Sequence, residues 1–150
     1  MERHEMTFTI YLEDTDAQGI VYHANYLHFF ERARTEILRK LGVDTSRQGD
    51  GDQKFVVHQV TIKYLKPALL DDEIFIKSSY ERVSDFRLSF DQQVYRHGTS
   101  GALVQAEIQL VCVNKRGKLI ELPSIFNDSE LIIHPVHPGF FSPSPVAIEE

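Results

Sequence analysis

The stretch that decides the fold is YLEDTDAQGIVYHANYLHFFERARTE, residues Tyr11 to Glu36, in which three acidic residues, a glycine and a histidine precede a helical pattern. From Asn25 onward the apolar positions are spaced four, three, four and four residues apart, a period that lines one face of an α-helix. These positions are Tyr26, Phe30, Ala33, Ile37 and Leu41. Gly42 then ends the pattern. We therefore predict one long helix with an acidic loop directly ahead of it.

Charged residues mark the other side of this helix. Glu31 with Arg34, and Arg32 with Glu36, have the spacing of helical ion pairs, each of which stabilises a helix by roughly 0.2–0.5 kcal/mol. We expect these four side chains to form a solvated or interface face.

The segments on both sides of the predicted helix have the pattern of β-strands. Apolar residues take alternate positions from Met6 to Leu12, which predicts a first strand. Four segments rich in β-branched and aromatic residues follow the helix: Phe55 to Lys66, Glu73 to Val83, Phe86 to Arg96 and Leu103 to Asn114. Ser84-Asp85 is short enough for a hairpin, and Leu119 starts a short return strand that ends at Pro123.

The lengths of these elements favour one architecture. A helix of roughly 17 residues is about 25 Å long, and strands of about 11 residues reach some 36 Å, so the strands can curve around the helix. We predict the α+β hotdog fold, in which a five-stranded antiparallel sheet wraps one long central helix. Because one helix cannot cover both faces and both edges of such a sheet, we also expect a homodimer.

The whole chain has the composition of a globular protein. It has 150 residues, 42% of them hydrophobic and 25% charged, and a formal net charge of −6. The acidic balance argues against a nucleic-acid partner, and no apolar run approaches the roughly 18 residues of a membrane span. We therefore expect a cytoplasmic protein. Its single cysteine, Cys112, lies among apolar residues and is predicted to be a buried, reduced thiol.

Proline divides the chain into two predicted regions. Five of the six prolines lie between Pro123 and Pro145. Regular secondary structure should therefore largely stop near Leu122. We predict one domain over residues 1–123 and a proline-rich C-terminal extension over residues 124–150, an extended arm anchored by its apolar residues.

Motifs for metal, nucleotide or serine-hydrolase chemistry are absent from the sequence. His28 with Glu31, and His134 with His137, have spacings that two metal ligands can share. A polar helix surface explains the first pair better, and neither pair has nearby cysteines. The sequence therefore predicts neither a metal nor a redox cofactor.

Asp16 is the best candidate for a reactive group. The simpler interpretation is that Glu13, Asp14 and Asp16 are surface residues of a loop beside the positive end of the helix. Their negative charge there would stabilise the helix by up to about 1 kcal/mol. However, a helix entry also leaves backbone N–H groups without partners, and these can hold a negative oxygen. A carboxylate beside such an oxyanion hole can attack an activated acyl group or orient and deprotonate water, and the sequence leaves both routes open.

The stretch EDTDAQGIVYHANYLHFFERARTE closely resembles the signature of the 4-hydroxybenzoyl-CoA thioesterase family of hotdog proteins, in particular the acyl-CoA thioesterase branch associated with the Tol-Pal system. The resemblance spans about residues 6 to 123. It implies that Asp16 is the catalytic aspartate and that the backbone N–H of His23 polarises the thioester, with the His23 side chain also in the site. It further places Gly19, Tyr22, Asn25 and Tyr26 around the substrate.

The resemblance implies an enzyme that hydrolyses short-chain or aromatic acyl-CoA, with acyl carrier protein thioesters as further possible substrates. It also suggests a homo-oligomer, either a dimer or a homotetramer built from two dimers. A hotdog dehydratase or hydratase and a non-enzymatic acyl-CoA-binding protein are the alternatives. Lys63, Lys66 and the cations of the NKRGK turn, residues 114–118, are candidates to hold the phosphates of coenzyme A.

Overall fold

A computed structural model describes residues 4–43 and 53–127 of the chain. Its long elements are β1 (His4–Thr9), α1 (Asn25–Lys40), β2 (Lys54–Tyr64), β3 (Glu73–Arg82), β4 (Arg87–Arg96) and β5 (Val104–Val113). A two-residue strand β6 (Leu119–Ile120) and two 3-10 helices, η1 (Leu12–Asp14) and η2 (Ser124–Asn127), complete them. Most of the predicted C-terminal extension, with His134 and His137, lies outside the described residues.

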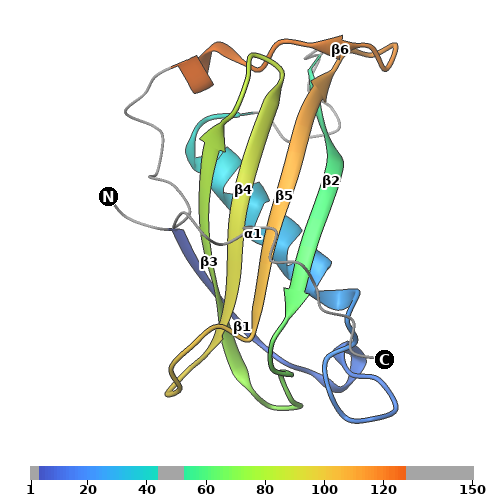
Figure 1. Ribbon diagram of the computed structural model, residues 1–150, viewed down its shortest axis with the longest axis vertical. Coiled ribbons are helices and arrows are strands. Elements are labelled where there is room, and N and C mark those ends of the chain that lie inside the picture. Colours follow the sequence, from blue (N-terminus) through green and yellow to red (C-terminus); the bar gives the residue numbers. More distant parts are fainter. Residues whose placement is uncertain (1–3, 44–52, 128–150) are drawn as a thin grey trace, which may run out of the picture.

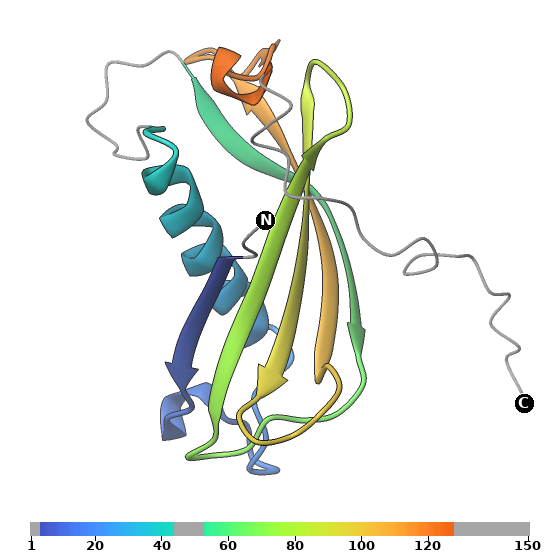
Figure 2. The same ribbon diagram turned by 90° about the vertical axis from the view of Figure 1, so that its left-hand side faces the viewer.

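The strands form one antiparallel sheet around α1. Its order is β1-β3-β4-β5-β2, and β6 pairs with the end of β5. Figure 1 shows β4 and β5 in front of the helix, and Figure 2 shows the sheet curving past one side of it. This arrangement confirms the predicted α+β hotdog fold with five long strands, to which β6 adds a short sixth. None of the described helices is both long and apolar enough to cross a lipid bilayer.

The core lies between α1 and the concave face of the sheet. The predicted helix face is buried at Tyr26, Phe30, Ala33 and Ile37. Alternate residues of β4 and β5 point toward it, as the period of two requires. Cys112 is among them, and burial raises the pKa of its thiol. The structure thus has a buried, free cysteine at this position, as predicted.

The first strand ends earlier than predicted. β1 stops at Thr9, and the chain turns through η1, where the Asp14 carboxylate accepts a hydrogen bond of 2.8 Å from the Tyr11 N–H. Leu12, predicted to lie in the strand, is 74% exposed. The alternating pattern predicted a strand that continues beyond its observed end. The acidic side chain stabilises a local turn there, which competes with the strand.

The predicted ion pairs on α1 do not form. Arg34 is buried and donates to the side-chain oxygen of Gln92 at 3.0 Å, while Arg32 lies over the rings of Phe8 and Phe29. Burial lowers the pKa of Arg34 to about 10. The spacing rule failed here because the sheet offers these side chains partners that a helix in isolation does not have.

One flank of the concave face is left uncovered. α1 packs on β1 and β3, at one side of the sheet. On β2, Val57 and Val60 share the concave face with their buried cross-strand partners Leu110 and Ile108, yet they are 51% and 37% exposed. His58, between them, lies at a bulge and is also exposed, so it is not a core residue.

The far end of the barrel-like sheet is closed by η2. Phe126 is buried and packs edge-on against Phe55 and Tyr80, with ring centroids 6.0 and 5.9 Å apart. The N–H of Leu122 donates to the carbonyl of Asp85. Packing against the core therefore continues past residue 123, the predicted end of the domain.

Candidate active site

Asp16 opens a tight turn between β1 and α1. Its N–H donates to the carbonyl of Ile20 at 2.9 Å, and its own carbonyl accepts from the N–H of Gly19 at 3.0 Å. Gly19 has φ 80°, a conformation that glycine adopts without strain, as the prediction of a tight turn requires. A bridge between Thr15 and Val21 closes the base of the loop. The turn holds the Asp16 backbone from both sides.

The three acids of the loop have different surroundings. Glu13 is exposed, and Asp14 is occupied by the Tyr11 N–H that it accepts in η1. Asp16 is half-buried, and its Oδ1 accepts a hydrogen bond of 2.8 Å from the N–H of Gln18. This local bond fixes the carboxylate by one oxygen.

The helix entry is tied to the acidic loop. The carbonyl of Asp14 accepts both the N–H of Tyr22, at 3.0 Å, and the side-chain amide of Asn25, at 2.8 Å. The side chain of Asn25 therefore orients the loop and does not cap the helix. Ala24 occupies the N-cap position and has no side chain to accept a helix N–H.

This entry leaves backbone amides without acceptors among the described residues. The N–H of Tyr22 donates to Asp14, and the N–H of Asn25 donates to the carbonyl of Tyr22 at 2.8 Å. Between them, the N–H groups of His23 and Ala24 donate to no acceptor within the described part of the chain. Unpaired amides at the positive end of a helix are suited to hold a negative oxygen.

A cleft of about 320 Å³ opens beside this entry. Its lining comprises Asp16, Ile20, Val21, His23, Tyr26, Tyr64, Leu65, Lys66 and Pro67. Of the predicted site residues, the structure brings together Asp16, His23 and Tyr26. Gly19 and Tyr22, in the loop, and Asn25, the first residue of α1, lie outside the lining. The ring of the half-exposed Tyr22 packs edge-on against His23, with ring centroids 4.5 Å apart.

Two tyrosines build the wall between the helix and β2. Tyr26 is 2% exposed, and its hydroxyl accepts the N–H of Ala68 at 3.1 Å. Burial is the main cause that raises the pKa of Tyr26. Tyr64, at the end of β2, donates from its hydroxyl to the carbonyl of His23 at 2.9 Å. The two rings lie 5.8 Å apart, so the wall is continuous.

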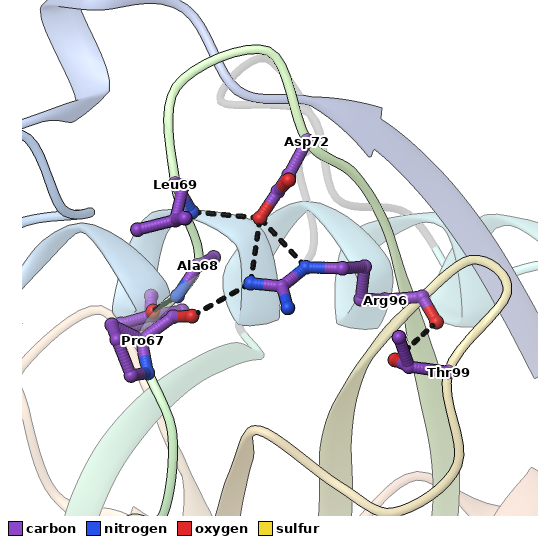
Figure 3. Close-up of polar contacts among 7 residues, drawn as sticks. Pro67, Ala68, Leu69, Asp72, Arg96 and Thr99 are labelled. Carbon is purple, nitrogen blue, oxygen red and sulfur yellow. Dashed lines mark hydrogen bonds and ion pairs between the residues drawn. The ribbon is translucent and has the colours of Figure 1, made fainter.

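A salt bridge behind the cleft holds its outer loop. The guanidinium of Arg96 contacts Asp72 at 2.8 Å through Nε and Nη2, and Nη2 also donates to the carbonyl of Pro67 at 2.9 Å. The same oxygen of Asp72 accepts the N–H of Leu69 at 2.8 Å, as Figure 3 shows. The sequence analysis identified neither Asp72 nor Arg96, since the two lie 24 residues apart.

The candidate phosphate-binding cations differ in their distance from the cleft. Lys66 lines the cleft. The NKRGK turn follows the end of β5 opposite to the one that pairs with Tyr64, so it lies at the far end of the sheet (Figure 1). Lys63 pairs with Gln105 on the convex face. Within one chain, Lys66 is therefore the candidate that borders the site.

The part of the chain that the structure describes contains no group of three or more His, Cys, Asp and Glu side chains placed to hold a metal ion. His28 and Glu31 are both exposed on the surface of α1.

The architecture agrees with what comparison with known proteins finds. The model of a family described as the thioesterase superfamily matches residues 18–102, which include Gly19, His23 and both tyrosines of the cleft wall. The chain belongs to the thioesterase superfamily. This membership confirms the family resemblance and the prediction of a thioester hydrolase.

Members of this superfamily resemble the chain over most of their length. The acyl-CoA thioesterase YbgC of Haemophilus influenzae is 41% identical over 106 residues, which cover 70% of this chain and 76% of the relative. A probable thioesterase from Bartonella henselae, a solved structure, is 35% identical with a TM-score of 0.72 and covers 81% of this chain and 100% of its own. A gentisyl-coenzyme A thioesterase structure is 25% identical with a TM-score of 0.74 and covers 83% and 99%.

Proposed function

We propose that this protein hydrolyses short-chain or aromatic acyl-CoA thioesters to the free acid and coenzyme A, with Asp16 and the helix-entry amides as its catalytic groups. The observation that carries the proposal is the position of Asp16 in one cleft with His23, whose N–H is unpaired among the described residues. The similarity to an acyl-CoA thioesterase and to a gentisyl-coenzyme A thioesterase supports the choice of substrate class.

In the proposed reaction, the thioester carbonyl oxygen accepts hydrogen bonds from the His23 and Ala24 amides, which stabilise the negative charge that develops there. Asp16 either attacks the acyl carbon, forming a mixed anhydride that water then cleaves, or deprotonates the attacking water. In both routes the carbon–sulfur bond breaks and the thiolate leaves with a proton from solvent. Water and the thioester are the only reactants, so the proposal requires neither a metal nor a redox cofactor.

The size of the cleft supports a compact acyl group. At about 320 Å³ it lies at the lower end of the range of small-molecule pockets, about 300–1,000 Å³. The tyrosine rings give it an aromatic wall, and Lys66 at its border can approach a phosphate of coenzyme A. A short-chain or single-ring acyl group fits this volume better than a long fatty acyl chain does.

A panel of acyl-CoA thioesters tests the proposal, with released thiol followed by a thiol reagent and the acid identified by mass spectrometry. We expect the highest kcat/KM for short-chain or aromatic acyl groups, and the matching carrier-protein thioesters should be assayed in parallel. No hydrolysis of any thioester would contradict the proposal. Loss of water from a β-hydroxyacyl-CoA without thiol release would favour the dehydratase alternative, and tight binding without turnover would favour the non-enzymatic one.

We also propose that two copies pair along β2, which would form the expected homo-oligomer. β2 is an edge strand, and the concave-face residues Val57 and Val60 are exposed beside it. Exposed apolar side chains on an unpaired edge favour association with another strand. A second copy would cover this flank and border the cleft, because Tyr64 belongs to the same strand. A homotetramer would then be a pair of such dimers.

Light scattering coupled to size exclusion tests the pairing. We expect a dimer or a larger assembly for the natural chain. Val60→Lys should shift it toward the monomer, because a charge replaces an exposed apolar side chain that the second copy would cover. Val83→Lys is the matched control, since Val83 is similarly exposed, at 49%, but lies in the β3–β4 hairpin. A monomeric natural chain, or equal effects of the two variants, would contradict pairing along β2.

A further inference from the structure

Two successive peptide groups at the start of α1 each have a carbonyl that accepts a hydrogen bond and an N–H without an acceptor among the described residues. The carbonyl of Tyr22 accepts the N–H of Asn25 at 2.8 Å, and the carbonyl of His23 accepts the hydroxyl of Tyr64 at 2.9 Å. The N–H groups of the same two peptides belong to His23 and Ala24, and neither donates to a protein acceptor in the described residues. In a trans peptide the N–H and C=O point in opposite directions, so each carbonyl contact fixes the direction of an unpaired N–H.

The two carbonyls are held by different means. Asn25 is the first residue of α1, so the helix itself supplies the donor to Tyr22. The donor to His23 comes instead from a side chain on β2, 41 residues away. A peptide whose carbonyl accepts a hydrogen bond is polarised and becomes a better donor at its N–H. The Ala24 N–H therefore depends on Tyr64 for both its orientation and its strength.

We propose that Tyr64 is a positioning residue, which orients and polarises the peptide between His23 and Ala24 so that its N–H can receive the negative charge of the thioester oxygen. This inference rests on the proposed thioester hydrolysis. It adds a residue outside the acidic loop and the helix, on the opposite wall of the cleft.

The sheet makes Tyr64 suited to this task. Its backbone pairs with Val104, and the next two N–H groups, of Leu65 and Lys66, both donate to the carbonyl of Leu103, at 2.8 and 3.0 Å. The Tyr64 ring lies 5.8 Å from that of Tyr26. A tyrosine hydroxyl is protonated at neutral pH, and partial burial raises the pKa of Tyr64 further, so this hydroxyl can donate.

The hydroxyl of Tyr64 contributes little to the packing of the hydrophobic core. Tyr64 remains 44% exposed, and its ring contacts would be kept by phenylalanine. A purely structural role predicts that loss of the hydroxyl leaves kcat unchanged in a folded enzyme. A positioning role predicts a loss in the chemical step alone, because the hydrogen bonds of the oxyanion hole strengthen in the transition state.

Tyr64→Phe tests the proposal, with kcat and KM measured on the best acyl-CoA of the panel. We expect kcat to fall roughly three- to tenfold, the scale of one supporting hydrogen bond, while KM stays within about twofold. Tyr95→Phe is the matched control, because it deletes a hydroxyl that donates to Gln93 on the convex face, and it should leave both constants unchanged. An unchanged kcat in Tyr64→Phe, or a rise in KM alone, would overturn the positioning role.

Infrared spectroscopy supplies a readout that does not depend on turnover. The probe is a dethia analogue of the same acyl-CoA, in which a methylene replaces sulfur and the carbonyl carries ¹³C. Binding to the natural enzyme should lower its C=O stretching frequency, and the shift should be smaller in Tyr64→Phe but not in Tyr95→Phe. Equal shifts in all three proteins would overturn the proposal. An inactive natural enzyme would instead contradict the proposed function, so the two failures are distinguishable.

Discussion

The two ends of α1 differ in whether their terminal backbone groups find hydrogen-bond partners within the protein. At the C-terminal end, the N–H of Gly42 donates to the carbonyl of Arg39 and the N–H of Val43 to that of Leu38, which satisfies two otherwise unpaired carbonyls. At the N-terminal end, Ala24 provides no capping side chain, and no acidic residue lies in the first turn. The closed end contributes stability, whereas the open end keeps its amides available to a ligand.

The charged residues near the two ends of α1 also differ. Arg39 and Lys40 lie in the last turn, where a positive charge is favourable. The acids Asp14 and Asp16 precede the helix entry, and each is held by a hydrogen bond within its own turn. The positive end of the helix is therefore bordered by fixed carboxylates and is not capped by them.

The largest expected effect is at the open end. Asp16→Asn keeps the shape of the side chain but removes its charge, and we expect kcat/KM to fall by about 10²-fold or more with an unchanged melting temperature. Thiol release and thermal unfolding measure the two quantities. Asp14→Asn, whose carboxylate holds η1, should cause a smaller loss of activity. Full activity in a folded Asp16→Asn protein would remove Asp16 from the mechanism.

A charge added at the N-cap should have the next largest effect. Ala24→Asp places a carboxylate beside the unpaired amides, where it repels a developing oxyanion, and we expect kcat to fall roughly tenfold. The neutral Ala24→Asn, of similar size, should lose less. Equal losses in the two variants would show that bulk, and not charge, matters at this end.

Two glycines provide a matched pair for the two ends. Gly19 and Gly42 have φ 80° and 78°, and an added Cβ would meet no atom within 4 Å at either position. Alanine should therefore impose a similar backbone strain at both, about 1 kcal/mol of unfolding free energy by denaturant titration. We expect Gly19→Ala also to lower kcat several-fold, because the strain falls on the turn that holds Asp16. Equal activities would contradict this role of the turn.

The smallest expected effect is at the closed end. Arg39→Gln removes an exposed ion pair of 2.7 Å with Glu36 and one favourable charge from the last turn. We expect a loss of roughly 0.3–0.5 kcal/mol of stability at low salt and no change in kcat. The loss should shrink as salt is added, and a salt-independent loss would point to packing of the arginine stem instead.

Much of the fold was predictable because it depends on local patterns. The helical period predicted where α1 begins and Gly42 predicted where it ends. Richness in β-branched and aromatic residues predicted four of the long strands to within two residues at each end. Candidate site residues could be predicted only where they lie in one contiguous stretch of sequence, as with Asp16 and His23. Arg34 was predicted wrongly because its partner, Gln92, lies 58 residues away.

The sequence by itself determined the order of the elements, the buried helix face and the acidic loop, since these depend on residues a few positions apart. The tertiary structure decided which amides stay unpaired and which side chains reach the helix entry. Tyr64 and His23 meet only because β2 pairs with β5 in one register and the sheet curves past α1. A hydrogen bond between distant residues depends on that register and curvature, which the local spacing of residues does not specify.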